Sequence, residues 1–184
     1  FEIYLLDKKN LKNIYKEEVH LKNDSDLIEC NLLNSFLDKN IFKIEKLIGN
    51  FLRSINVIIE NDQTLNCLMG IKKKNYGKKI NKYYLESSLK DLKGLFKENY
   101  QNKKMIHFIV NRCSIDGVNY MLFDEEIDGD NMCVEVKFIS VSNTLIDEIS
   151  SVLEKYQIKI DRWFEKKYVD NLFKAENVEL SRIA

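Results

Sequence analysis

The stretch from Asn81 to Trp163 constrains the fold of this chain most, because the spacing of its apolar residues changes several times in a definite order. Helical spacing over 81–100 gives way to period-two alternation over 105–142, the pattern of strands with one buried face. Helical spacing then returns at 144–157, before a short strand pattern. The expected order is helix, strand, hairpin strand, acidic turn, long strand, helix, strand. The two helical stripes contain Leu85, Leu89, Leu92 and Phe96, and Leu145, Ile146, Ile149, Val152, Leu153 and Tyr156.

The residues before this stretch carry weaker signals. Two extended runs around a polar segment predict a β-hairpin over residues 1–21. An amphipathic helix is expected over 38–56, with Asp38 or Asn40 as its N-cap. A strand should follow and end at Gly70, and its buried face would carry Leu65, Cys67 and Met69.

Composition excludes several classes of protein. Lys+Arg and Asp+Glu both number 29 in 184 residues, so no net field attracts nucleic acid or an anionic membrane. No apolar run approaches the roughly 20 residues of a membrane span. Four scattered cysteines and two histidines form no zinc-binding pattern, which favours reduced thiols in the cytoplasm.

Several segments in fixed order carry a resemblance. They are M-I-H-F-I-V (105–110), S-I-D-G (114–117), an acidic turn with Gly129, V-E-V-K-F-I-S-V (134–141), a helix, and Y-Q-I-K-I-D-R (156–162). This order resembles the strand-helix-strand-strand insert of the bacterial actin-like cell-division protein FtsA. The N-terminal hairpin, an N-L-L-N segment, a helix and a strand ending in Gly are similar to that family's first actin-like subdomain.

The resemblance implies an α+β fold in two parts. Residues 1–78 and 165–184 would form a truncated actin-like (ribonuclease H-like) first subdomain, and residues 79–164 would form the insert. The family's second lobe contains glycine-rich phosphate and adenosine segments. This sequence has six glycines and no Gly-Gly pair, so we expect that lobe to be absent and no cofactor to be bound.

The resemblance also implies a role. It would be a non-catalytic cell-division adaptor at the septum, at the inner face of the cell membrane. Its partners would be short cytoplasmic segments of membrane division proteins and neighbouring copies of itself. FtsZ and ATP bind largely through the second lobe in the family, so no nucleotide is expected here and FtsZ is a doubtful partner. Membrane contact would be peripheral, and no nucleic acid is expected.

Two segments are candidates for partner binding. The basic segment 72–79 could neutralise anionic groups while its tyrosine stacks, and it should form a loop. The S-I-D-G turn lies beside an edge that could accept an extended peptide. The alternatives are a solvated loop, or a nucleic-acid or ligand-binding α+β module that uses the same loop. The candidate residues are Lys72, Lys73, Lys74, Tyr76, Lys78, Lys79, Ile115, Asp116 and Gly117.

Two other features are interpreted as structural. Asp124 to Gly129 with Glu135 follows the spacing of an EF-hand calcium loop. Its flanks have strand patterns, however, and Glu126 is too long for the third ligand, so a solvated acidic turn is expected. His107 lacks a nucleophile at triad spacing, which favours a structural histidine over a general base. No constellation of residues indicates an enzyme.

Overall fold

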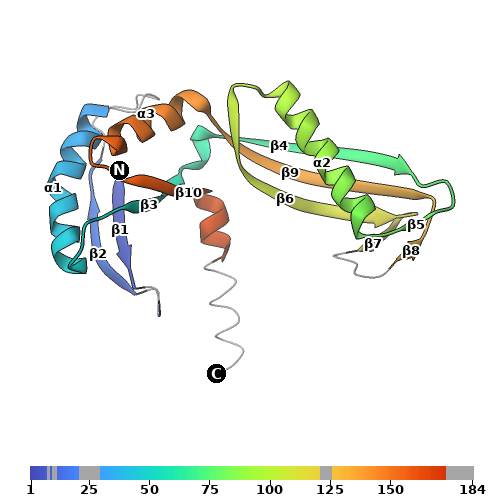
Figure 1. The fold of residues 1–184 in the computed structure, drawn as a ribbon, viewed down its shortest axis with the longest axis horizontal. Coiled ribbons are helices and arrows are strands. Elements are labelled where there is room, and N and C mark those ends of the chain that lie inside the picture. Colours follow the sequence, from blue (N-terminus) through green and yellow to red (C-terminus); the bar gives the residue numbers. More distant parts are fainter. Residues whose placement is uncertain (8, 10–11, 21–29, 121–125, 173–184) are drawn as a thin grey trace. The chain divides into compact units, whose positions relative to one another are not determined.

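A computed structural model describes residues 1–7, 9, 12–20, 30–120 and 126–172 (Figure 1). It contains helices and mostly antiparallel strands, which confirms the α+β class. None of the helices in these ranges is long and apolar enough to cross a membrane.

The chain divides into two compact units at boundaries that differ from those predicted. One unit comprises residues 1–57 and 144–162, and the other comprises 58–143 and 163–184. The predicted boundary at 78/79 is displaced because β4 (Thr64–Lys74) pairs with β9 (Asn131–Ser142) along its whole length. A strand hydrogen-bonded over eleven positions belongs to the sheet that it completes.

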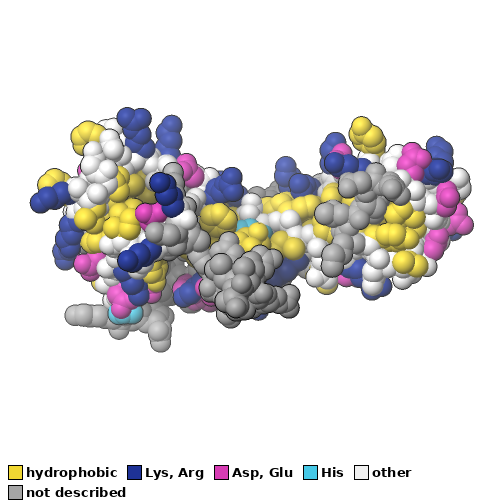
Figure 2. Space-filling view, turned by 90° about the horizontal axis from the view of Figure 1, so that it is seen from below, with side chains coloured by type: hydrophobic (Ala, Val, Ile, Leu, Met, Phe, Trp, Pro, Cys, Tyr) yellow, Lys and Arg dark blue, Asp and Glu magenta, His cyan; other side chains and the backbone are white. Residues whose placement is uncertain are grey.

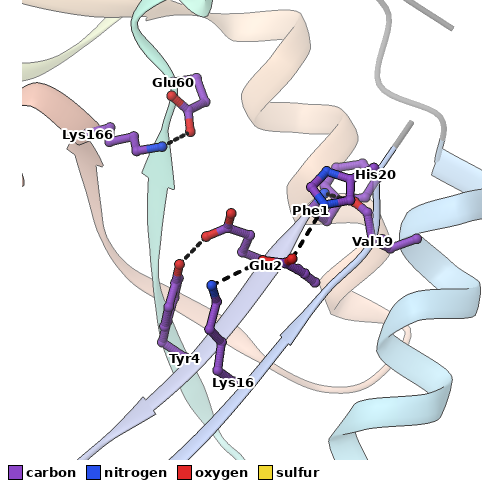
Figure 3. Close-up of polar contacts among 9 residues, drawn as sticks. Phe1, Glu2, Tyr4, Lys16, Val19, His20, Glu60 and Lys166 are labelled. Carbon is purple, nitrogen blue, oxygen red and sulfur yellow. Dashed lines mark hydrogen bonds and ion pairs between the residues drawn. The ribbon is translucent and has the colours of Figure 1, made fainter. Parts of the chain in front are cut away.

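The first unit begins with the predicted hairpin, in which β1 (Glu2–Leu6) pairs antiparallel with β2 (Asn13–Glu18). The amino group of Phe1 donates to the carbonyl of Val19 at 2.7 Å and closes the open end of the hairpin (Figure 3). The exposed face carries an ion pair between Lys16 and Glu18 at 3.1 Å.

The helix α1 (Cys30–Ile48) starts eight residues before the predicted position, so the two proposed N-caps are wrong. Asn40 lies in the middle of the helix and is 3% exposed. Its amide donates to the carbonyl of Phe36 at 2.7 Å and accepts from the Tyr15 hydroxyl at 2.6 Å. This buried amide is tolerated because both its nitrogen and its oxygen are hydrogen-bonded. The helix ends at Gly49, whose φ of 71° is the usual left-handed termination.

The remaining elements of this unit close its core. β3 (Ser54–Ile59) pairs with β10 (Lys159–Glu165), and α3 (Asn143–Glu154) buries the predicted apolar stripe. The Tyr156 hydroxyl, just after α3, donates to the carbonyl of Asn34 at 3.1 Å and to the carboxylate of Asp38 at 2.8 Å. Burial and this carboxylate raise the pKa of Tyr156 to about 12. Segments more than 100 positions apart in sequence are thereby joined.

The second unit is a four-stranded antiparallel sheet in the order β4-β9-β6-β7, with α2 (Lys82–Asn99) across one face (Figure 1). β6 (Lys103–Ile115) and β7 (Val118–Tyr120) form the predicted hairpin. The Asn81 side chain caps α2 by accepting from the backbone N–H of Tyr84 at 3.1 Å. Smaller elements are η1 (Asn61–Gln63), β5 (Lys79–Ile80) and β8 (Ile127–Asp128), and residues 166–172 are helical.

The core of the second unit lies between α2 and the sheet. Phe96 of α2 stacks on Phe138 of β9 with ring centroids 4.6 Å apart, as the helical stripe predicts. Residues of β4 that face this core alternate with residues that face away. The fully buried core residues include Ile80, Leu92, Phe96, Met132, Val134, Val136 and Phe138.

The opposite face of the sheet is covered at one end by the segment that follows Arg162. The ring of His107 lies 4.2 Å from that of Tyr168 and 5.8 Å from that of Phe164. The backbone N–H of Glu165 donates to Nε2 of His107 at 3.0 Å. His107 is thus a structural residue, and its acceptor nitrogen requires a neutral ring.

Candidate functional site

The basic segment 72–79 is not the single loop predicted from the sequence. Lys72, Lys73 and Lys74 belong to β4, which extends past Gly70, and Lys79 belongs to β5. The strand continues because its backbone pairs with β9 as far as Lys74. Alternation therefore sends successive lysines to opposite faces of the sheet.

The three lysines of β4 differ in what they contact. Lys73 faces α2, forms an ion pair with Asp91 and lies 5.9 Å from the ring centroid of Tyr84. It therefore fastens the helix to the sheet. Lys72 and Lys74 are exposed, and no residue in the described ranges forms an ion pair with either one.

The turn after β4 is held by hydrogen bonds of a buried asparagine, and it exposes an aromatic ring to solvent. Asn75 is 5% exposed, its N–H donates to the carbonyl of Asp130 at 2.7 Å, and its amide donates to the carbonyl of Gly129 at 3.1 Å. Tyr76 has a φ of 53°, which is uncommon outside glycine. Its ring is 83% exposed, beside the exposed Lys78.

The predicted S-I-D-G site is mostly structural. Ile115 is 2% exposed and belongs to the core, so its side chain cannot contact a partner. Asp116 and Gly117 have φ values of 46° and 86°, as a two-residue hairpin turn requires. The Asp116 carboxylate accepts from the backbone N–H groups of Asp130 at 2.8 Å and Asn131 at 2.9 Å, and these bonds lower its pKa.

Charges at this end of the sheet are mixed in sign. β5 pairs with β8, which places Lys79 opposite Asp128, and Lys79 also forms an ion pair with Glu126 at 3.6 Å. Lysine and arginine side chains are interspersed with acidic ones on the face seen in Figure 2. Phosphate binding depends on accumulated positive charge, so this arrangement disfavours a nucleic-acid surface at the turn.

The calcium-like spacing falls partly outside the described residues, since Asp124 and Glu125 lie there. Asp128 is in the short strand β8, and Glu135 is in the middle of β9. Within the described ranges no three His, Cys, Asp or Glu side chains are grouped to hold a metal ion.

A hollow of about 570 Å³ lies on the sheet face that turns away from α2. Three predicted residues, Lys72, Asp116 and Gly117, line this hollow. They come from β4 and from the turn between β6 and β7, which β9 brings together. Sequence reasoning missed the other contributors, chiefly Arg112, Ser114, Cys133 and Glu135.

The hollow contains two cations, Lys72 and Arg112, and two carboxylates, Asp116 and Glu135, and Lys72 is one of the groups that lower the pKa of Asp116. Arg112 is exposed, and its Nε donates to the Asn119 side chain at 2.8 Å. As with Lys72, no ion pair joins Arg112 to any residue that the structure describes. Because the lysine and the arginine are both exposed, a carboxylate that approaches from solvent can bind to them.

Arg112 was missed because β6 is irregular. Its pairing with β9 shifts register between Met105 and His107 and again between Val110 and Arg112. Each bulge reverses the direction of the side chains that follow, so simple alternation from His107 does not place Arg112. An interruption of the alternation after Val110 is the one sequence signal that could have indicated this.

A scan against models of known protein families finds no match to this chain, and a search of curated proteins finds no significantly similar sequence.

Proposed function

We propose that this chain is a non-catalytic adaptor of bacterial cell division, similar to FtsA, that acts by binding other proteins. The order of segments quoted above supports the proposal. The longer elements β4, α2, β6 and β9 also occur in the chain in the order strand, helix, strand and strand, with the short strands β5, β7 and β8 between them. In this proposal the insert begins at β4 rather than at residue 79, and the first unit is a truncated actin-like subdomain.

One observation carries the binding role: an available sheet edge beside exposed lysine and arginine side chains. β4 is at the edge of its sheet and, among the described strands, pairs with β9 alone. Edge strands present unpaired N–H and C=O groups that an extended peptide can satisfy. Lys72 on this strand and Arg112 across the hollow favour a peptide with carboxylates.

The proposed partner is a short cytoplasmic segment of a membrane division protein, bound at the inner face of the membrane. Self-association could use the same edge. Neither ATP nor FtsZ is part of this proposal.

The test is recovery of division proteins from cell extract by wild-type protein and by a Lys72→Glu, Lys74→Glu variant. Each reversal replaces an attraction of about 0.5 kcal/mol by a repulsion of about 0.5 kcal/mol. With both reversals, affinity for an acidic partner should fall roughly 10- to 30-fold. A Lys90→Glu, Lys97→Glu variant is the matched control, because these exposed lysines lie on α2.

The outcomes separate the alternatives. Equal recovery of the same partners by both variants would exclude the β4 edge. Recovery of nucleic acid in place of division proteins, lost as salt is raised, would favour the nucleic-acid module. Circular dichroism of both variants should match the wild type, since exposed substitutions change stability by about 0.5 kcal/mol.

A further inference from the structure

The β4 edge has a definite order of side chains on the face that turns away from α2. Cys67 Sγ lies 3.6 Å from the Tyr100 hydroxyl at the end of α2, and Lys73 pairs with Asp91 of α2. Odd-numbered residues of β4 therefore face the helix, and even-numbered residues face the opposite side. The recognition row on that side consists of Leu68, Gly70, Lys72 and Lys74.

From this row we infer the sequence pattern of the peptide that β4 selects. It is acidic-x-acidic-x-x-x-apolar, read from N- to C-terminus and bound antiparallel to β4. The inference rests on the proposed adaptor function and goes beyond it by specifying the partner. Antiparallel addition is chosen because it is the more stable pairing and continues the pattern of the sheet.

The two acidic positions follow from Lys72 and Lys74. Both lysines are exposed, and neither forms an ion pair within the described residues, although Lys72 helps to lower the pKa of Asp116. They are about 6.8 Å apart along the strand, which is the spacing of alternate side chains on an added strand. Acidic residues at alternate positions can therefore meet both lysines, whereas adjacent acidic residues can meet only one.

The position opposite Gly70 should not be acidic. A Cβ built on Gly70 would lie 3.5 Å from Cγ of Glu135, so the Glu135 side chain lies beside the space that this glycine leaves. A third carboxylate there would be repelled by Glu135. The β4 edge thus attracts acidic residues at the first two positions of this face and repels one at the position opposite Gly70.

The apolar position follows from Leu68, which is 61% exposed on the same row. An apolar side chain opposite it would remove both surfaces from water. Because Leu68 is six residues before Lys74, antiparallel pairing places this side chain six residues after the first acidic position.

The experiment measures binding of labelled nine-residue peptides to the full chain by fluorescence anisotropy, and the peptides with alternate acids and with adjacent acids have equal composition. Peptides with acidic residues at positions 1 and 3 and Leu at 7 should bind about threefold to tenfold more tightly than peptides with adjacent acids. Adding a third acid at position 5 should weaken binding to the wild type. The Glu135→Gln variant should tolerate that third acid.

Equal affinity for peptides with alternate and with adjacent acids would overturn the pattern. So would a third acid at position 5 that weakens binding to Glu135→Gln as much as it weakens binding to the wild type. Slower hydrogen exchange of β4 amides in the complex should accompany binding, and its absence would place the peptide elsewhere. The peptide experiment and the extract experiment are independent. If the chain prefers peptides with alternate acids but recovers no division proteins from extract, the cell-division role is refuted while the peptide pattern stands.

Discussion

Replacing Gly129 by alanine tests how the turns at one end of the sheet are packed. A Cβ at this position would lie 2.2 Å from Cγ2 of Ile115 and 3.0 Å from Oδ2 of Asp116. Ile115 is 2% exposed in the core, and Asp116 is fixed by backbone N–H groups, so neither can move aside freely. Gly129 is not among the glycines with positive φ, so the penalty is steric rather than conformational.

The expected loss of stability is that of overpacking, about 1–3 kcal/mol. For a chain of this size it corresponds to a fall in melting temperature of roughly 2–12 °C. Urea unfolding can be followed by the fluorescence of Trp163, the one tryptophan, which belongs to the second unit. A Gly94→Ala control, with no atom within 4 Å of the new Cβ, should instead stabilise α2 by about 0.5–1 kcal/mol.

A double mutant identifies the clash. Leucine lacks the Cγ2 branch of isoleucine, so Gly129→Ala should destabilise an Ile115→Leu background by about 1 kcal/mol less than it destabilises the wild type. Unchanged urea midpoints for Gly129→Ala, or the same loss in both backgrounds, would refute the proposed packing.

Two further predictions concern the core of the second unit and the contacts of His107 at the other end of the sheet. Phe96→Ala should destabilise the second unit by about 3–5 kcal/mol, because the ring is 1% exposed and stacks on Phe138; a loss under 1 kcal/mol in urea unfolding would contradict this. Burial lowers the pKa of His107, despite the opposing effect of Glu165, so the native state binds fewer protons than the unfolded state. Stability should be complete above pH 6.5, the ordinary histidine pKa, and should fall as pH drops below it. His107→Gln should flatten that slope in urea unfolding at several pH values.

Local pattern was sufficient where one face of an element is buried. The stripe that ends in Phe96 predicted α2, the alternation around Val136 predicted β9, and Asp116-Gly117 predicted a hairpin turn. In each case the requirement acts within a few residues, because an amphipathic stripe or a positive φ is a property of neighbouring positions.

Local pattern failed where the deciding partner is distant in sequence. The start of α1 was misplaced because Asn40 resembles a cap, yet Tyr15 makes it a satisfied buried group. The sequence predicts a loop at 72–79, yet its first three lysines belong to β4, because pairing with β9 outweighs the low strand preference of lysine.

The sequence by itself determined the α+β class, the order of most elements and the residues that face the core, because these depend on periodicity. Only the tertiary structure decided that Lys73 forms an ion pair with Asp91 while Lys72 lies on the opposite face of the sheet, and that Lys72 and Arg112 line one hollow. The physical reason is that strand register and bulges set the direction of each side chain, and both depend on hydrogen bonds between segments far apart in the chain.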